Sequence, residues 1–351
     1  MNFPSLLDGV LSPSIALRGE PSNESLGVAR AAIEGLSAKQ KSLPAWLFYD
    51  AAGSRLFEQI TRLPEYYLTS LEQSIFSRHA TDIVAKAAGS IEQPLCVVEL
   101  GAGSASKTLT LLRAVMVRQG DTLYLPVDVS QAALELASKN VHAALPQIEV
   151  QPICSEFTHE KDLNLPAMGR KLALYIGSSI GNFDPDDAVE LLGWLRTQLQ
   201  PGDALLLGTD MVKDVAPLLA AYNDRAGVTA GFNKNILARL NRELGANFAL
   251  NAFDHRAIWN ASQSRIEMHL DSRCDQMVHI ERLHRNFGFK RRESIHTENS
   301  YKFSPEQVGE MLQTSGYALE QSWYDDKRWF GVHLARIVDA ESLPTDEDAA
   351  A

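Results

Sequence analysis

The stretch LCVVELGAGSASKT, residues 95–108, decides the fold of this chain. Its first six residues form a nearly continuous apolar run, which predicts a buried strand, and the glycine-rich turn after it leads into a segment with helical spacing. Gly101 and Gly103 let the backbone turn sharply and approach a ligand where a Cβ atom would collide. A dinucleotide-binding turn has a third glycine three residues after the second, but that position is Ser106. The turn therefore indicates a cofactor smaller than a dinucleotide, although taken alone it also fits an ordinary strand-to-helix connection.

The apolar run belongs to a repeated pattern of strands and helices. We expect strands at residues 95–100, 122–128, 148–153, 172–177 and 204–210, separated by helical segments at 106–119, 131–145 and 187–199. Ser130 and the pair Asp184-Pro185 stand where two of these helices begin, and both are suitable for a helix start. Repeats of this kind imply right-handed crossovers and a doubly wound α/β sheet.

The rhythm changes after Asp210. A helical, asparagine-rich region (221–248) is followed by two segments, 265–273 and 277–283, that read as strands of a separate, inserted antiparallel element. The pattern then resumes with a helix at 304–316 and strands at 317–325 and 329–338. Because only a few residues link these two strands, they must be antiparallel, so the sheet should end with one reversed strand. That reversal is typical of a methyltransferase sheet and not of an all-parallel dinucleotide-binding sheet.

The composition narrows the function classes. Asp and Glu number 44 against 33 Lys and Arg, and the formal charge of −11 disfavours nucleic acid as a partner. No apolar run reaches the ~18 residues of a membrane span, and no secretory signal is visible, so we expect a cytoplasmic protein without membrane contact. The three cysteines (Cys96, Cys154 and Cys274) and the nine dispersed histidines have no metal-binding spacing, so we expect a mechanism without a metal.

Acidic residues follow the second and third expected strands. Asp128 ends the second strand, where a carboxylate can accept two hydrogen bonds from a ribose diol. Glu156 and Phe157, just past the third strand, can contact an adenine amine and a ring face. They can equally be an ordinary loop acid and a core aromatic.

The fourth strand leads into IGSSIGNF (176–183), close to where a methyltransferase places the reacting methyl group. Gly177 and Gly181 permit close backbone approach, and the Asn182 side chain offers both a donor and an acceptor to a polar substrate. Asn182 also fits a simple cap of the following turn.

Together with motifs outside the nucleotide fold, these blocks resemble the histidine-specific methyltransferase family, which trimethylates the α-amine of L-histidine on the way to ergothioneine. The resemblance extends from about Phe48 to Arg336. Its most specific blocks are YDAAGSRLFEQITRLPEYYLTSLE (49–72), VELGAGSASKT (98–108), YIGSSIGNF (175–183), AYNDRAGVTAGFNKNILARLNRELGANF (221–248), RIEMHL (265–270) and TENSYKF (297–303).

The resemblance implies a class I methyltransferase fold with its last strand antiparallel, an inserted α+β substrate-binding domain, and S-adenosylmethionine as cofactor. We expect residues 1–75 and 211–300 to form the substrate-binding lid. Residues 76–210 and 301–338 should form the Rossmann-like cofactor domain, and 339–351 an acidic tail.

The resemblance also implies the roles of individual residues. Tyr66, Asn182 and Tyr222 match positions that hold the carboxylate and amine of the substrate, and Tyr49 matches a tyrosine lining the amine end. The residues matching those around the imidazole are Glu298, Ser300 and, as an apolar wall, Met268. On the cofactor side the matching residues are Gly101, Gly103, Lys107, Asp128, Glu156, Phe157 and Gly177. The family usually carries Asp-Phe in place of Glu156-Phe157 and a Gly-Thr pair near Ser178-Ser179.

Without the resemblance, several of these residues have ordinary explanations. Tyr49, Tyr66 and Tyr67 fit an aromatic core cluster, and Met268 in an alternating strand fits the core. Glu298 fits an N-cap partner or a surface charge.

The implied chemistry is methyl transfer to a small amino acid. An α-ammonium must lose its proton before attack, and we expect tyrosine hydroxyls and water to hold the amine, with Tyr49 as the nearest assisting group and no dedicated strong base. Glu298 can accept from an imidazole N–H, which favours histidine. The alternatives are the same chemistry on tryptophan or another amino acid, a dinucleotide-dependent oxidoreductase, and a non-catalytic protein that retains the methyltransferase fold.

Overall fold

An eight-stranded sheet carries the glycine-rich turn in the computed structural model, which describes residues 23–89, 94–155, 162–167 and 169–337. The strands lie in the order β12-β13-β6-β5-β1-β2-β3, and β4 also pairs with β2. Their bounds are β1 Leu95–Leu100, β2 Leu123–Asp128, β3 Glu149–Val150, β4 Ile153–Cys154, β5 Arg170–Tyr175, β6 Ala204–Asp210, β12 Tyr317–Tyr324 and β13 Phe330–Ile337. The expected strand at 148–153 is therefore two short strands, separated at Pro152, which has no N–H to donate to a ladder.

One strand of the sheet runs against the others. β1 pairs in parallel with β2 and β5, and β5 pairs in parallel with β6. β13, by contrast, is antiparallel to both β6 and β12. The expected reversal of the last strand is confirmed, and this strand lies between β6 and β12 instead of at the edge.

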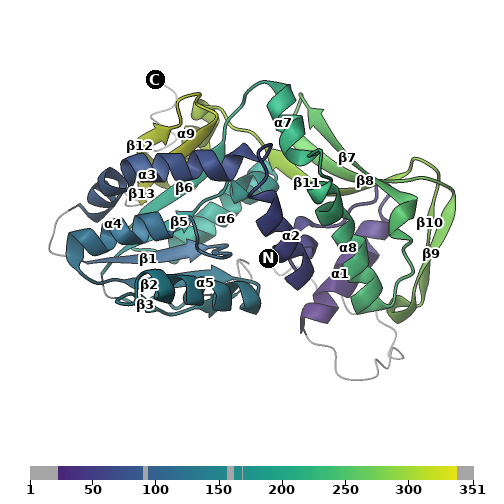
Figure 1. Cartoon of the computed structure of the whole chain (residues 1–351), viewed down its shortest axis with the longest axis horizontal. Helices are drawn as coiled ribbons and strands as arrows, with labels where there is room; N and C mark the ends of the chain where they lie inside the picture. The colour runs from purple at the N-terminus through teal and green to yellow at the C-terminus, as the bar shows by residue number, and fades with distance from the viewer. Residues whose placement is uncertain (1–22, 90–93, 156–161, 168, 338–351) are drawn as a thin grey trace, which may run out of the picture.

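Helices cover both faces of the sheet, as the doubly wound pattern predicts (Figure 1). One face packs against α3 (Tyr67–Ala88), α4 (Leu109–Gln119) and α5 (Gln131–Ala144), and the other against α6 (Pro185–Thr197) and α9 (Pro305–Thr314). Alternate residues of β1 serve the two cores: Val97 belongs to the first and Val98 to the second, and both are fully buried. The chain is thus a class I methyltransferase-type α/β fold.

Both helices start where expected, at Ser130 and Asp184, but only Ser130 makes a side-chain cap bond. The Ser130 hydroxyl accepts from the Ala133 N–H at 3.3 Å and caps α5. Pro185 opens α6, but the Asp184 side chain makes no cap bond. It accepts instead from the Tyr301 hydroxyl at 2.9 Å, so Asp184 ties this helix to the second lobe.

The second lobe consists of the N-terminal segment and the stretch between β6 and α9. It contains a three-stranded antiparallel sheet, β11-β8-β7, and a two-stranded sheet, β10-β9. The bounds are α1 Asn23–Ser37, η1 Ala45–Phe48, α2 Ala51–Ile60, α7 Val215–Tyr222, α8 Val228–Leu244, η3 Leu250–Ala252, β7 Phe253–Asn260, β8 Arg265–Ser272, β9 Gln276–Ile280, η4 Glu281–Leu283, β10 Arg285–Phe289 and β11 Ser294–Tyr301. The strands expected at 265–273 and 277–283 are confirmed as β8 and β9.

The expected boundary between residues 75 and 76 falls inside α3, which is a continuous helix. α3 packs along its length against α4 and β13, so it is part of the sheet layer. We propose that the cofactor lobe begins near Tyr67. The expected acidic tail, 339–351, lies outside the described residues.

Two of the three connections that the structure describes between the lobes, those after β6 and after β11, run side by side. The Phe303 N–H donates to the Asp210 carbonyl at 3.0 Å, and the Val212 N–H donates to the Phe303 carbonyl at 3.0 Å. The carboxyl end of β6 is thereby fixed against the chain that returns from β11. Within the described residues, no helix is long and apolar enough to cross a membrane.

Candidate active site

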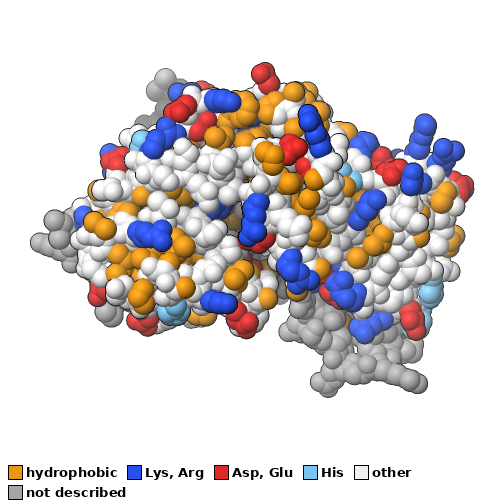
Figure 2. Space-filling view, viewed as in Figure 1, with side chains coloured by type: hydrophobic (Ala, Val, Ile, Leu, Met, Phe, Trp, Pro, Cys, Tyr) orange, Lys and Arg blue, Asp and Glu red, His pale blue; other side chains and the backbone are white. Residues whose placement is uncertain are grey.

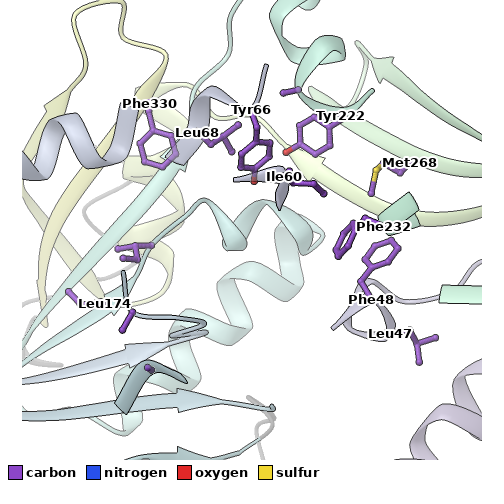
Figure 3. Close-up of a cluster of buried hydrophobic side chains, with 14 of the residues drawn as sticks. Leu47, Phe48, Ile60, Tyr66, Leu68, Leu174, Tyr222, Phe232, Met268 and Phe330 are labelled. Atoms are coloured by element: carbon purple, nitrogen blue, oxygen red, sulfur yellow. The ribbon is translucent and has the colours of Figure 1, made fainter. Parts of the chain in front are cut away.

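A small chamber of about 40 Å³ lies between the lobes. Its lining includes every residue that the family resemblance assigned to the substrate. These residues come from six separate segments: Tyr49 after η1, Tyr66 before α3, Asn182 at the end of η2 (Ser179–Asn182), Tyr222 at the end of α7, Met268 on β8, and Glu298 and Ser300 on β11. Figure 3 shows Tyr66 and Tyr222 with their hydroxyl groups directed into the same space. The aromatic and apolar residues among them are also core residues, so the ordinary explanation and the functional one both apply.

A β-bulge directs Glu298 into the chamber. His296 pairs with His269 across β11 and β8, whereas Glu298 pairs with Met268, so Thr297 is an extra residue in the ladder. The Thr297 hydroxyl donates to the Met268 carbonyl at 3.0 Å and to Asn233 at 2.8 Å, which holds the bulge in place. Because the bulge shifts the alternation by one residue, Glu298 shares the chamber face with Met268.

The Glu298 carboxylate is partly buried and has a neutral partner. The Asn182 amide donates to Glu298 Oε1 at 2.7 Å and to the Asn299 carbonyl at 2.8 Å. Burial raises the pKa of Glu298 to about 7, although the Asn182 bond and the charge of Lys302 lower it. Both amide hydrogens of Asn182 are thus engaged, so only its carbonyl oxygen can bind a ligand, and as an acceptor. The side chain does not cap the turn.

Aromatic rings surround Tyr49. Its ring makes edge contacts with Phe57 and Phe232, both at 5.8 Å between centroids, and Phe57 makes an edge contact with Tyr66 at 6.2 Å. Burial raises the pKa of Tyr49 well above its ordinary value, so the phenol stays protonated. Sequence reasoning missed Phe57 and Phe232 as lining residues, although both lie inside quoted blocks, because apolar aromatics on helices look like core.

A larger cleft of about 940 Å³ adjoins the chamber and shares Tyr49, Asn182 and Glu298 with it. Its lining includes the expected cofactor residues Gly101 and Gly103. Both have positive φ, and a Cβ atom on either would meet nothing within 4 Å, so the backbone of the turn faces open space. The surface is hollowed where the lobes meet, with basic and acidic side chains beside the opening (Figure 2).

Asp128 also lines the larger cleft, at the end of β2. Its carboxylate accepts from the Gly103 N–H at 3.1 Å and from the Ser130 N–H at 2.9 Å. A carboxylate has about four acceptor positions, and the Val129 N–H also contributes a bond, so acceptor capacity remains for a hydroxyl donor. The residues present therefore fit a ribose at this position beside a backbone that can be approached closely.

Lys107 and Gly177 both contact one buried carboxylate, and Gly177 also lines the chamber. Lys107 Nζ pairs with Glu72 Oε2 at 2.6 Å, and the other oxygen of Glu72 accepts from the Gly177 N–H at 2.7 Å. A Cβ atom on Gly177 would lie 2.8 Å from Lys107 Nζ, so the glycine makes room for the lysine. Glu72, fully buried on α3, was missed by the sequence reasoning. It connects α3 to both loops at the carboxyl end of the sheet.

The structure does not place the three remaining expected residues in the lining of the chamber or the cleft. Gly181 approaches the second lobe and not a ligand, since its Cβ atom would lie 2.8 Å from the Tyr301 carbonyl oxygen. Glu156 and Phe157 lie outside the described residues.

A cluster of buried charges lies behind the chamber. The Asp210 carboxylate, at the end of β6, contacts Lys302 Nζ at 3.0 Å, Lys213 Nζ, and the Tyr67 hydroxyl at 2.8 Å. Asp210 is fully buried and both lysine side chains are nearly so. Burial lowers the pKa of Lys213 to about 8, while Asp210 opposes this shift. Sequence reasoning did not single out this cluster.

Among the described residues, one group could bring three metal-ligating atoms together: Glu267, His269 and His296, within 4.8 Å of one another. It lies on the opposite face of β8 and β11 from the chamber, because His269 pairs with His296 and not with Glu298. His269 already bonds Glu267 at 3.1 Å and Ser294 at 3.0 Å. The group is separate from the chamber, although His296 also lines the larger cleft.

Comparisons with known proteins give one consistent family. A family model described as "Histidine-specific methyltransferase, SAM-dependent" matches residues 28–337. The histidine N-alpha-methyltransferase of Mycolicibacterium smegmatis is 44% identical over 302 residues, covering 86% of this chain and 92% of that protein. The protein of the same description from Mycobacterium tuberculosis is 39% identical, covering 88% of this chain and 95% of that protein. Ergothioneine biosynthesis protein 1 of Neurospora crassa is 30% identical, covering 84% of this chain and 33% of that protein.

The burial of Glu298 predicts a pH-dependent loss of stability. Its pKa is about 7 in the folded chain and 4.5 ordinarily, so folding strengthens proton binding. The contribution of Glu298 to the free energy of unfolding is therefore complete below pH 4.5. It is lost as the pH rises through 7, and the loss reaches up to about 3 kcal/mol. We expect Glu298→Gln to reduce the fall in unfolding free energy between pH 5 and pH 8, measured by urea denaturation of the ligand-free protein.

Glu306→Gln, at an exposed acid on α9, is the control for removing a carboxylate. Equal pH dependence in the wild type and in Glu298→Gln would contradict a titrating Glu298.

Proposed function

This chain belongs to the family of histidine-specific, S-adenosylmethionine-dependent methyltransferases, and from this we propose that it methylates the α-amine of L-histidine, three times in succession, to give trimethylhistidine. The observation that carries the proposal is the chamber itself. It joins a buried carboxylate to neutral hydroxyl and amide groups, and it opens onto the cleft that contains Asp128 and the glycine turn.

The cleft would hold the cofactor through two kinds of contact. Asp128 would accept from the ribose hydroxyls through its remaining lone pairs, and the backbone at Gly101 and Gly103 would approach the cofactor closely. When bound, S-adenosylmethionine supplies a methyl group on a positively charged sulfur, open to attack by a neutral amine.

The chamber would select histidine through its contacts with the ring. Glu298 accepts from a ring N–H, and a ligand without such a donor leaves a buried carboxylate unsatisfied. Met268, 1% exposed, is the apolar wall beside it. A bicyclic indole is larger than an imidazole and would need more room beside Met268, which lines the chamber. These features favour histidine over tryptophan.

The amine would be held at neutral oxygen atoms. The Asn182 carbonyl oxygen accepts from an amine N–H, because its amide hydrogens already bond Glu298 and the Asn299 carbonyl. Tyr49 stays protonated, so it cannot act as a phenolate base, but its oxygen can accept an N–H and lead the proton to water. The faces of Tyr49 and Phe57 are suited to a growing ammonium through cation–π attraction.

The first test is a product assay with the purified protein. We expect histidine alone, among the proteinogenic amino acids incubated with S-adenosylmethionine, to gain one, two and three methyl groups, followed by mass spectrometry. Methylation of another amino acid would contradict the roles given to Glu298 and Met268. Absence of any product, with cofactor binding retained, would favour a non-catalytic binding protein.

The cofactor role of Asp128 can be tested by Asp128→Asn. We expect roughly 10- to 100-fold weaker binding of S-adenosylhomocysteine by calorimetry, because a hydrogen bond to a charged group contributes about 1.5–3 kcal/mol. Glu135→Gln, an exposed acid on α5 outside the cleft lining, is the matched control and should bind normally. Unchanged affinity in Asp128→Asn would remove the ribose contact.

The role of Tyr49 can be tested by Tyr49→Phe, which keeps the ring and removes the hydroxyl. We expect the second and third transfers to slow by roughly 10-fold or more relative to the first, because proton transfer assisted by a positioned group contributes on that scale. Mono- and dimethylhistidine should then accumulate in a time course. Tyr324→Phe, on β12 and outside the chamber, is the control. A product distribution like that of the wild type would exclude this role for the hydroxyl.

A further inference from the structure

Lys302 is a buried lysine whose ammonium contacts two chamber residues from behind. Its side chain is fully buried, and Nζ lies 2.7 Å from Ser300 Oγ, 3.1 Å from the Tyr222 hydroxyl oxygen and 3.0 Å from Asp210 Oδ2. An ammonium has three hydrogens and no acceptor, so these three contacts use its full donor capacity. Lys302 does not line the chamber, while Tyr222 and Ser300 do.

These contacts determine how the two hydroxyl groups can be oriented. Both oxygens accept from Lys302, so neither hydroxyl hydrogen can point toward the lysine. The two oxygens lie 2.6 Å apart, and one hydrogen therefore lies between them. The other hydrogen is directed toward the chamber, because Tyr222 and Ser300 both face it. The pair thus presents a donor to a ligand.

The charges behind the pair have the sign that suits an anionic ligand. Lys302 and Lys213 share the single carboxylate of Asp210, and Tyr67 adds only a neutral hydroxyl. Lys302 is the cation of this cluster that contacts the pair, and its charge acts on a ligand in a region where screening is weak. Glu298, the acid of the chamber, is hydrogen-bonded to Asn182 and not to this pair. The chamber is thus positive behind Tyr222 and negative at Glu298.

We propose that Lys302 is a positioning residue for the carboxylate of the amino-acid substrate. It orients the Tyr222–Ser300 pair so that Ser300 donates to Tyr222 and Tyr222 donates to the carboxylate, while Ser300, which the resemblance places beside the imidazole, keeps a lone pair for the ring. Lys302 also supplies the positive charge that a carboxylate requires, without entering the chamber. A lysine inside the chamber would repel the α-ammonium and the growing methylated cation. This inference rests on the proposed function, because it assumes an amino-acid substrate.

The test compares L-histidine with L-histidinol, which replaces the carboxylate by a neutral alcohol and keeps the ring and the amine. Dissociation constants are measured by calorimetry in the presence of S-adenosylhomocysteine. We expect the wild type to bind histidine at least roughly 10-fold more tightly. In Lys302→Met, histidine affinity should fall roughly 10- to 100-fold while histidinol affinity changes little. In kinetics, KM should rise while kcat is largely kept.

Lys213→Met is the matched control. Lys213 is equally buried and shares Asp210, but it contacts Tyr67 and not Tyr222 or Ser300. We expect it to keep most of the preference for histidine over histidinol. The double variant Tyr222→Phe/Lys302→Met should be little worse than either single variant, because the lysine acts through this hydroxyl.

Equal weakening of histidine and histidinol in Lys302→Met, with cofactor-product binding intact, would mean a merely structural lysine. Equal binding of the two ligands by the wild type would overturn the proposal without any variant. If Lys302→Met fails to fold, Asp210→Asn/Lys302→Met removes one charge of each sign and keeps the net charge, so it tests the orientation of the hydroxyl pair alone: loss of the preference for histidine supports the proposal, and a retained preference contradicts it. If the wild type methylates a different amino acid, the proposed substrate is wrong, and that amino acid and its amino alcohol give the same test of Lys302.

Discussion

The structure depends on satisfying one buried carboxylate, that of Asp210. An unpaired charge at this depth would be strongly destabilising, so the chain must bring donors to it. Tyr67 comes from the start of α3, Lys213 from the connection leaving β6, and Lys302 from the connection that returns after β11. The Asp210 N–H also donates to Ser178 Oγ at 2.8 Å, beside η2. One residue at the end of a sheet strand thus contacts all three lobe connections and the loop that lines the chamber.

The cofactor side of the fold follows from local chemistry, which explains why the sequence was sufficient to predict it. Buried apolar runs, a turn with glycine at positive φ, and an acid at the next strand end are short-range signals, and the structure has them at β1, Gly101 and Asp128. One local prediction failed for a local reason, because Pro152 divides a strand. The predicted start of α6 at Asp184-Pro185 is confirmed, although the Asp184 carboxylate bonds a distant tyrosine and makes no cap bond. The pairing of Lys107 with Glu72 joins residues 35 positions apart, so no local pattern indicates it.

The substrate side could be predicted only through the family resemblance. Alternation along β11 would place Glu298 on the same face as His296, away from the chamber, and only the extra residue Thr297 reverses it. The bulge depends in turn on Asn233 of α8, 64 positions earlier. Periodicity in a single strand cannot reveal such a partner. The charge cluster around Asp210 was missed for the same reason, since each member looks like an ordinary surface residue in its own segment.

The energetic cost of placing like or unpaired charges in the interior also explains the polar groups of the chamber. They are hydroxyls and amides, although charged groups would bind the substrate more strongly. A zwitterion brings a negative and a positive group into a small volume beside a second cation, the sulfonium of the cofactor. A lysine in contact with the carboxylate would also lie close to both cations, and in a weakly screened interior that repulsion would offset its benefit. Neutral oxygens at Tyr222 and Ser300 avoid the contact, while the field of the lysine behind them still reaches the carboxylate. The buried Glu298, although it destabilises the ligand-free fold near neutral pH, then marks the opposite end, so that the amino acid can bind in one orientation with its amine facing the cleft.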